Sequence, residues 1–565
     1  MSSEPLNARL TSVILALPIY LWLFAMVLVP MLLLLGYSFL RSESGAVVQE
    51  FTLVNYALLF ERITYPLVLA NTVLVALGSA LLATLVAYPM AYFVCTNIRH
   101  HKIAVILLVI IPLWISLLLR AFAWKIILGE NGALNSFLVS WGVLDRPTTL
   151  LLYNRFAVFL TLTYVSLPYV FITSYTALER IPRSLIEASR DAGASTLQTV
   201  RRIVWPLTRQ PVAIGFALAF LISVGDYVTP AMVGGLNGTM IGTIIASQFG
   251  LAGNWPFGSA LSIFLLIAVS AVLFAVAMLV RTRAVIEAGA PFSSINPPTW
   301  SSIGFARRAG RVISWVLFIV PYVVLYAPLL IIGVFSFNNS QTQAFPFAGV
   351  SLRWYSDLVA NQNLLDALQR SVSVGLIVAF ASMVVGTFFA ILLSQRKFPA
   401  VTIVQSGLVV PAVLPGIVLG ISLALTFRMF RLEPGIVTVI LGQMTFVVPV
   451  IMLVVLARLR SLDPSLEQAS ADLGAQGWQT FTRIKLPLIR SAILGGGLLG
   501  FTLSFDEVIV TLFLSGPKPT LPVYIWNQLR FGFTPAINAA FTLIGIFSIC
   551  SIVVATKLLD TSKKP

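Results

Sequence analysis

The sequence predicts an all-α membrane protein whose twelve transmembrane helices form two parallel repeats of six. Three observations lead to this fold class. The chain of 565 residues is 58% hydrophobic and only 10% charged, which is far more apolar than a soluble protein of this length. Apolar runs without charges, each about 18 residues or longer, recur along the chain, and such a run can cross a bilayer as a helix. A polar segment between these runs occurs twice in similar form.

The apolar runs are continuous rather than alternating, which favours helices over a barrel. The run from Thr11 to Leu40 is longer than the apolar core of a cleaved signal peptide, so we interpret it as the first span. The first six predicted spans cover residues 12–36, 66–94, 103–128, 156–178, 213–233 and 258–280. The second six cover residues 313–337, 371–394, 402–426, 436–457, 492–513 and 537–556.

The positive charge of the chain is distributed unequally across these spans. The amino terminus, every second loop and the carboxyl tail hold 24 of the 36 Lys and Arg residues but 9 of the 20 acids. By the positive-inside rule this side is cytoplasmic, so both termini of this multi-pass membrane protein are predicted to lie in the cytoplasm. Because the net charge of +16 follows the topology, we do not interpret it as a nucleic-acid-binding surface.

The two polar segments, residues 179–212 and 458–491, are here called the first and second polar segment. At an offset of 281, 13 of the 24 positions from 184 to 207 have an identical counterpart. Both segments follow an even number of spans, so the halves are predicted to be parallel repeats. The predicted organisation is a first half at 1–280, a cytosolic linker at 281–312 that contains Pro297 and Pro298, and a second half at 313–565.

Local chemistry predicts that each polar segment forms two short helices separated by a glycine. Ser184 with Glu187, and Ser195 with Gln198, have the spacing of capping boxes. In the second segment Ser465 with Gln468 has the same spacing, and Asp463 is a competing cap. Gly193 and Gly474 are placed to end the first helix in a left-handed conformation. Leu185, Ala188 and Ala192, matched by Leu466, Ala469 and Leu473, give each first helix a small apolar face.

The pattern Glu-Ala-Ser-x-x-x-Gly from Glu187 to Gly193, followed by Ile-x-x-Pro from Ile203 to Pro206, resembles the "EAA" loop of permease subunits of bacterial ATP-binding-cassette importers. The resemblance implies that each polar segment is a coupling helix that docks on a cytosolic ATPase. Gln468 stands where the repeat places Glu187, which is a mild departure from the pattern. The implied ATPase-coupling residues are Ser184, Leu185, Glu187, Ala188, Gly193, Ser465, Leu466, Gln468, Ala469 and Gly474.

Two further stretches narrow the resemblance to importers of putrescine and spermidine. The stretches "SVGDYVTPAMVGG" and "GNWPFGSA" resemble one member of that permease pair, and the stretch from Ser504 to Asn538 resembles the other. The resemblance therefore implies two permease subunits fused in one chain and a polyamine cargo. Permeases for opines, 4-aminobutyrate and aminoalkylphosphonates resemble these stretches too, so those cargoes stay open as alternatives.

Three acids lie within or at the outer edge of the two fifth spans: Asp226 in the first half, and Asp506 and Glu507 in the second. An ionised side chain at such a position is costly and usually marks a pathway or an ion pair. Asp226 meets Glu507 at the offset of 281 and Asp506 after a slip of one residue; we favour Asp506 as the residue facing the path. The alternative is that these acids bond to Arg120, Lys125 or backbone groups and only hold the bundle together. The predicted path residues are Asp226, Tyr227, Asp506, Glu507 and Trp526, with Trp255 and Tyr524 as further aromatic candidates for an ammonium group.

The residue patterns also limit the class of function. No Gly-x-x-x-x-Gly-Lys-Ser/Thr loop occurs, so we expect that the chain does not hydrolyse ATP itself and binds no cofactor. A membrane enzyme is disfavoured because the sequence has no metal cluster and no nucleophile–base constellation. His100 and His101 are interpreted as loop residues, and no metal site is predicted. The resemblance implies three kinds of partner: two ATPase copies that carry ATP-Mg, an extracytoplasmic solute-binding protein, and membrane lipids. The rival is an ion-coupled secondary transporter, which also suits twelve spans in two halves.

Overall fold

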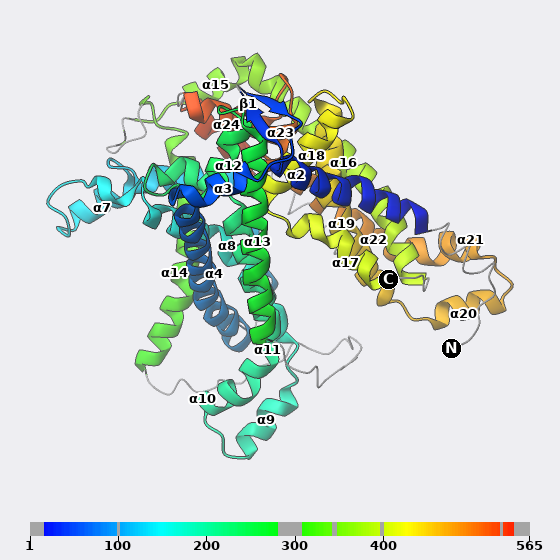
Figure 1. The fold of residues 1–565 in the computed structure, drawn as a ribbon. Helices are drawn as coiled ribbons and strands as arrows, with labels where there is room; N and C mark the ends of the chain where they lie inside the picture. The colour runs from blue at the N-terminus through cyan, green and yellow to red at the C-terminus, as the bar shows by residue number, and fades with distance from the viewer. Residues whose placement is uncertain are drawn as a thin grey trace. The chain divides into compact units, whose positions relative to one another are not determined.

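The computed structural model of the protein describes residues 16–43, 45–98, 102–280, 308–341, 347, 349–395, 401–531 and 535–546 (Figure 1). Most of the predicted linker, the cytosolic turn with His100 and His101, and Cys550 lie outside the described residues. The regular elements of the described residues are helices and one antiparallel hairpin, β1 (Arg41–Glu43) and β2 (Ala46–Val48), in which Ser42 pairs with Val47.

Within the described residues, nine helices are long and apolar enough to cross a membrane, or ten if one bent pair counts as a single span. The bent pair, Ala104–Leu113 and Leu117–Ser140, turns by 89° and occupies the third predicted span. The nine helices are Ala16–Ser38, Thr64–Asn97, Arg155–Glu179, Leu197–Gly225, Trp255–Val280, Trp315–Phe335, Gln362–Ser394, Ile436–Arg460 and Gly477–Phe505. The twelfth predicted span is described only as the shorter apolar helix Ala536–Ile546.

The third and ninth predicted spans are broken rather than continuous. In the third, α5 (Lys102–Ile110) passes through η2 (Ile111–Trp114) and an extended Ser116 into α6 (Leu117–Leu128). In the ninth, α17 (Val401–Val413) ends before Pro415, and α18 (Gly416–Met429) begins after it. A proline disfavours helical geometry in the residue before it and lacks the N–H that would continue the ladder, which accounts for the second break.

The chain forms two compact units. Unit 2 consists of Val54–Gly250 and Leu261–Leu352. Its centre is a bundle of α4 (Thr64–Asn97), α8 (Arg155–Glu179) and α11 (Trp205–Gly225), with α14 (Arg308–Phe335) packed on α4 and α6. A Cβ at Gly215 would clash with the side chain of Thr173, so this glycine allows α8 and α11 to approach closely. Shorter elements of this unit are α3 (Val54–Glu61), α7 (Ala133–Ser140), η3 (Thr149–Leu151) and α12 (Ile241–Phe249).

Helix α14 belongs to the second half of the sequence, yet it is bonded into unit 2. The Tyr322 hydroxyl donates to the carbonyl of Val105 at 3.0 Å, and the Tyr326 hydroxyl donates to that of Leu108 at 2.8 Å. In return, the Tyr164 hydroxyl of α8 donates to the carbonyl of Leu325 at 3.1 Å. Buried polar contacts of this kind hold helices together where apolar packing alone is not specific.

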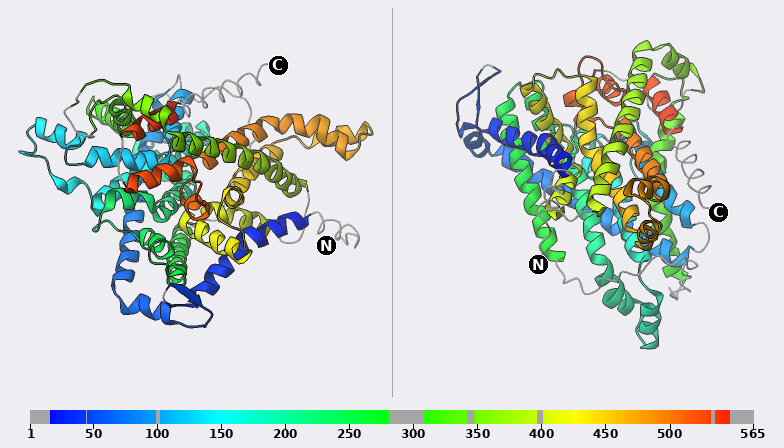
Figure 2. Two further views of the ribbon diagram at one scale, coloured as in Figure 1. Left: turned by 90° about the horizontal axis from the view of Figure 1, so that it is seen from above. Right: turned by 90° about the vertical axis from the view of Figure 1, so that its right-hand side faces the viewer.

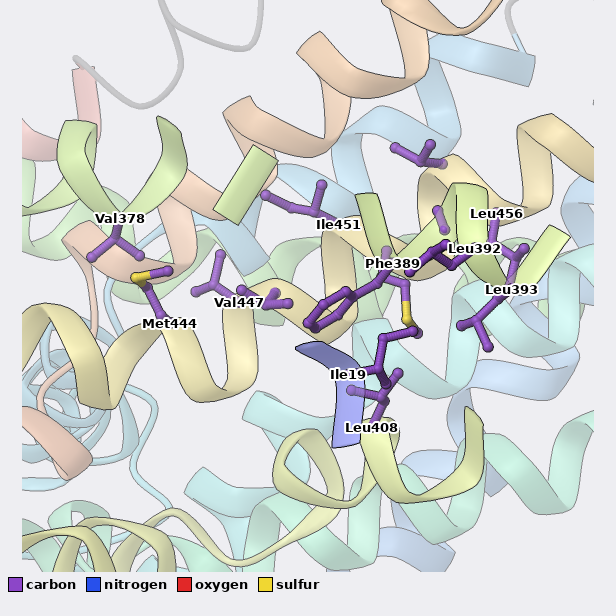
Figure 3. Close-up of a cluster of buried hydrophobic side chains, with 14 of the residues drawn as sticks. Ile19, Val378, Phe389, Leu392, Leu393, Leu408, Met444, Val447, Ile451 and Leu456 are labelled. Carbon is purple, nitrogen blue, oxygen red and sulfur yellow. The ribbon is translucent and has the colours of Figure 1, made fainter. Parts of the chain in front are cut away.

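Unit 1 consists of Met1–Leu53, Leu251–Ala260 and Arg353–Pro565. Its centre is a bundle of α16 (Gln362–Gln395), α19 (Ile436–Arg460) and α22 (Leu486–Phe505), while α2 (Val29–Ser38) packs on α18. The first apolar helix enters this core, where Ile19 lies beside Leu408 and Phe389 (Figure 3). The remaining elements are η1 (Phe24–Leu28), α15 (Arg353–Ala360), α23 (Ile509–Leu514) and α24 (Leu521–Phe531); α13 (Trp255–Val280) has residues in both units.

The two compact units therefore do not coincide with the two halves of the sequence, because two spans are exchanged and Leu251–Ala260 of the first half belongs to unit 1. The first span is part of unit 1 with residues 353–565, and α14, the seventh span, is part of unit 2 with the first half. The division at residues 281–312 describes the repeat in the sequence, and as a boundary between domains it stays a prediction. Hydropathy identifies a span but contains no information on which bundle the span joins.

Candidate functional site

The first polar segment folds as a helix, a glycine break and a second helix. Helix α9 (Arg183–Asp191) is followed by Gly193 with φ +76°, and then by α10 (Thr196–Thr199). The Gly193 N–H donates to the carbonyl of Arg190 at 2.8 Å, and the Ala194 N–H donates to that of Ser189 at 3.0 Å. These two bonds form a Schellman motif, which satisfies the last carbonyls of the helix. The predicted left-handed glycine is confirmed.

The second polar segment has the same construction. Helix α20 (Ser465–Asp472) ends at Gly474 with φ +75°, and α21 (Gly477–Thr480) follows. Gly474 donates to the carbonyl of Ala471 at 2.9 Å, and Ala475 donates to that of Ser470 at 3.1 Å. In Figures 1 and 2 each segment lies at the end of long helices. The first segment, α9 with α10, lies beyond the end of α11; the second, α20 with α21, lies beyond the ends of α19 and α22.

The caps agree with the sequence prediction only in part. The N–H of Ser195 donates to Gln198 Oε1 at 2.8 Å, and the N–H of Gln198 donates to Ser195 Oγ at 3.3 Å, so this capping box is confirmed. The predicted box at Ser184 is wrong: α9 begins at Arg183 after Pro182, which places Ser184 inside the first turn.

In the second segment the competing cap is the one that forms. Asp463 Oδ1 accepts from the N–H of Ser465 at 2.9 Å, so the predicted box of Ser465 with Gln468 is wrong. This hydrogen bond from a backbone N–H holds the pKa of Asp463 below its usual value. The carboxylate is therefore ionised at neutral pH, and it stabilises the start of α20.

A buried hydrogen bond that the sequence analysis did not identify joins the two helices of each segment. The hydroxyls of Ser189 and Thr199 are 2.9 Å apart, and those of Ser470 and Thr480 are 2.8 Å apart. All four residues are buried, and the two pairs correspond at the offset of 281. The signal was available in the sequence, because both pairs are among the identities of the repeat. Each polar segment is therefore a folded unit and not a loop.

We expect Ser189→Ala and Ser470→Ala to loosen their polar segments. Each substitution removes a buried hydrogen bond and leaves a threonine hydroxyl with one partner fewer, at a cost of about 1 kcal/mol in local stability. Hydrogen exchange of the glycine and alanine amides that follow α9 and α20 measures this opening. Ser184→Ala, at an exposed position, is the matched control and should leave the exchange unchanged. Equal protection in all variants would contradict the expected role of the bond.

The predicted coupling residues are accessible in both segments. Ser184, Leu185, Glu187 and Ala188 are exposed on α9, and the corresponding residues Ser465, Leu466, Gln468 and Ala469 are exposed on α20. Leu185 is 39% exposed and Leu466 is 41% exposed, which is much for leucines on short helices. A Cβ at Gly193 or Gly474 would meet open space. The small apolar face of each helix is therefore uncovered in the described structure.

Each polar segment continues directly into a long helix. The π-helical turns η4 (Val200–Val204) and η6 (Phe481–Lys485) occupy equivalent positions, and Pro206 and Pro487 follow them in α11 and α22. A proline donates no N–H to the helical ladder, and the turns of the ladder before it widen in both copies. A groove of about 1700 Å³ lies beside the second segment. Its lining includes Phe388 of α16, Arg460 of α19 and Phe481 of η6.

The long helices that start at the polar segments end at the predicted acids. Helix α11 ends at Gly225, and the buried Asp226 Oδ1 accepts from the N–H groups of Val228 at 2.8 Å and Thr229 at 3.0 Å. The Thr229 hydroxyl also donates to this carboxylate, and η5 (Pro230–Gly234) follows. The Asp226 carboxylate thus accepts the first free N–H groups of the next helical turn, and in this way it caps that turn.

Glu507 has the same role in the other half. Helix α22 ends at Phe505, and Glu507 Oε1 accepts from the N–H of Val510 at 2.7 Å at the start of α23. The alternative in which the acids bond to backbone groups therefore applies to both Asp226 and Glu507. Asp506, between α22 and Glu507, is half-buried, and its N–H donates to the carbonyl of Thr502 at 3.2 Å. The role of Asp506 as the path residue stays a prediction.

The aromatic candidates are placed differently from one another. Tyr227 is 2% exposed and Trp526, on α24, is 4% exposed, so both lie inside their units. The Trp255 ring already faces a cation of the chain, because the Arg428 guanidinium carbon lies 4.6 Å from its centroid. Tyr524 accepts a long hydrogen bond from the Asn361 amide at 3.4 Å. The path role of Tyr227 and Trp526 stays a prediction, and Trp255 is the least suited to a cargo ammonium.

The sequence of the chain is similar to a known protein family and to known permeases. The model of the family "binding-protein-dependent transport system inner membrane component" matches residues 6–285. The spermidine/putrescine permease PotB of Haemophilus influenzae is 34% identical over 257 residues, which are 45% of this chain and 89% of the relative. The putrescine permease PotI of Escherichia coli is 35% identical over 237 residues, 40% of this chain and 84% of the relative.

A bacterial alginate ABC transporter in complex with its periplasmic protein is a solved structure with similarity to the chain, at a TM-score of 0.40 and 18% identity over 49% of the chain. Each permease relative is matched over most of its own length but over less than half of this chain, which is consistent with two fused permeases. Permeases of this family are membrane subunits without enzyme activity. The chain belongs to the family of binding-protein-dependent transport system inner membrane components.

Proposed function

We propose that the chain is the membrane-spanning subunit of an ATP-driven importer that carries a small cationic amine, putrescine or spermidine, into the cytoplasm. The observation that carries the proposal is the polar segment that is built twice, folded, exposed and joined directly to a transmembrane helix. The names of the permease relatives support a polyamine as the cargo.

The energy comes from two copies of a cytosolic ATPase, one on each polar segment, and ATP-Mg is bound there and not on this chain. Both segments offer the same construction at equivalent positions, which suits two identical partners. The side that holds them is cytoplasmic by the charge bias of the loops, and both termini lie on that side. An extracytoplasmic binding protein delivers the cargo to the opposite face, which is supported by the dependence on a binding protein in the family name.

The helices α11 and α22 connect the two ends of this machinery. Each is about 20 residues long and so extends about 30 Å, from a polar segment at one end to an acid at the other. A displacement of the first helix of a segment is transmitted through η4 or η6, because these turns are continuous with the long helix. ATP binding draws the ATPase copies together and turns the path outward, and hydrolysis turns it inward, by differential contact with the two states.

The test of the proposal is uptake of labelled putrescine and spermidine into proteoliposomes that contain this chain, its ATPase and its binding protein. We expect uptake that requires ATP inside and binding protein outside. Uptake driven by a proton gradient without ATP would overturn the importer and support a secondary transporter. ATP hydrolysis stimulated by the binding protein without polyamine uptake would retain the importer and reject the cargo, and 4-aminobutyrate and opines would then be tested in the same vesicles.

A further inference from the structure

The two polar segments share a backbone but not a surface. Over the 24 equivalent positions 182–205 and 463–486, the first has four basic and two acidic residues, and the second has two basic and three acidic residues. On the first helices, the exposed Glu187 and Arg190 of α9 are replaced by Gln468 and Ala471 on α20. The first surface is therefore cationic and the second is weakly acidic.

The apolar part of the surface changes in the opposite direction. Ala192 ends α9, and at the equivalent position Leu473 ends α20 with 88% of its surface exposed. The backbone is the same at both residues, with φ −75° and ψ 5° at Ala192 and φ −80° and ψ 6° at Leu473. A nearby exposed position differs as well, because Trp478 replaces Leu197. Large apolar side chains at such exposure mark contact surfaces when they lie together.

The two segments also differ at two positions whose side chains are buried and apolar in the first segment. Ile186 and Val204 are buried at 6% and 1% exposure, and the equivalent residues Glu467 and Lys485 form an ion pair at 2.6 Å. The Lys485 side chain is 8% exposed, so its charge is compensated by Glu467 and contributes little to the outer surface. A partner that reaches α20 meets Leu466, Ala469 and Leu473 beside the acid Glu467, whose side chain is 57% exposed. A partner that reaches the first segment meets the exposed basic residues Arg190, Arg201 and Arg202.

We infer that the two ATPase docking sites differ in chemistry: Leu473 anchors a salt-resistant apolar site on α20, whereas the first segment, with the exposed Arg190 on α9 and Arg201 and Arg202 on η4, provides a salt-sensitive site for an acidic patch on the same ATPase. This inference rests on the proposed function of the segments. Apolar residues that become fully buried carry most of the affinity of an interface, and exposed charges mainly contribute a salt-dependent part. The occupant is the ATPase subunit of the proposed importer, because the Leu466, Ala469 and Leu473 face lies on a helix that the Ser470–Thr480 hydrogen bond joins to α21, which continues through η6 into the transmembrane helix α22.

The experiment titrates the purified ATPase onto the full chain in lipid nanodiscs, at about 0.05 M and about 0.5 M salt, where the Debye length falls from about 14 to about 4 Å. For the wild type we expect two binding phases, of which one is lost at high salt. Leu473→Ala should weaken the salt-resistant phase about tenfold, since most of a buried leucine side chain is removed, and should leave the other phase unchanged. Ala192→Leu, at the same backbone geometry, should make the salt-sensitive phase resistant.

The outcomes separate this inference from the function on which it rests. Two phases with equal salt dependence, or no effect of Leu473→Ala on either phase, would overturn the inference and leave the importer in place. No binding of ATPase to the wild type would overturn both. The occupant is checked with Leu473→Cys and a water-soluble maleimide, in a chain whose Cys95 and Cys550 are replaced by Ser: protection by the ATPase supports the inference. Protection by lipid or by self-association without ATPase overturns it.

Discussion

Replacing Gly193 or Gly474 with Pro is expected to reduce ATP-driven uptake at least about tenfold while the protein still inserts into the membrane. Both glycines have φ near +75°, and a proline ring holds φ near −65°, a mismatch that costs about 3 kcal/mol or more at each site. Proline also removes the N–H that donates to Arg190 or Ala471 in the Schellman motif. The first helix of the segment would then lose its fixed direction, and the ATPase its docking surface.

The measurement is uptake in proteoliposomes, with the amount of inserted protein determined in parallel. Gly477→Ala is the matched control: it lies in the second segment at the start of α21, and a Cβ there meets open space. This variant should transport like the wild type. Full uptake by both proline variants would contradict the assignment of the polar segments as coupling elements, because no docking surface of this geometry would then be needed.

Asp506→Asn is expected to lower polyamine uptake at least about tenfold without a loss of stability. Removing a charge that pairs with an ammonium group in a site shielded from water costs a few kcal/mol of binding. Glu507→Gln is the matched control next to it, because the glutamine carbonyl oxygen still accepts the hydrogen bond that the N–H of Val510 donates to Glu507. Glu507→Gln should therefore transport nearly as well as the wild type.

The initial rate of uptake against putrescine concentration separates the two variants, and thermal unfolding in detergent checks their stability. A normal rate for Asp506→Asn together with a large loss for Glu507→Gln would exchange the roles of the two residues. Normal rates for both would remove the acids from the path and assign the selectivity for cations to the binding protein.

The sequence was sufficient to predict the features that depend on a long apolar run or on the conformational freedom of a single residue. Long apolar runs identified α4, α8 and α19 because a bilayer span requires such a run whatever its neighbours are. Gly193 and Gly474 were identified as left-handed because few other residues adopt that conformation. The repeat also located the buried pair of Ser189 and Thr199, although identity alone did not reveal that the two hydroxyls meet.

The features that were missed depend on competition between neighbouring groups. The predicted fifth span ran to residue 233, but the Asp226 carboxylate binds the N–H groups of Val228 and Thr229 and ends the helix at Gly225. Hydropathy averages over this effect, since one carboxylate hardly changes a window of apolar residues. Ser184 was predicted as the N-cap, but the N-cap is Pro182, two residues earlier, and the helix begins at Arg183. Membership of the first span in unit 1 follows from tertiary packing, which no local pattern contains.

The exchange of the first and seventh spans sets an order for biosynthesis. A ribosome releases the first span long before its packing partner α18 exists, because that helix begins at Gly416. Unit 2 lacks α14 until most of the first 335 residues have been inserted, so it too waits for a helix from beyond the linker. If the two halves were separate polypeptides, the first span would have to reach unit 1, and α14 would have to reach unit 2, by diffusion in the membrane. Fusion makes both events intramolecular, raising the effective concentration of each missing helix and ensuring one copy of each half per transporter.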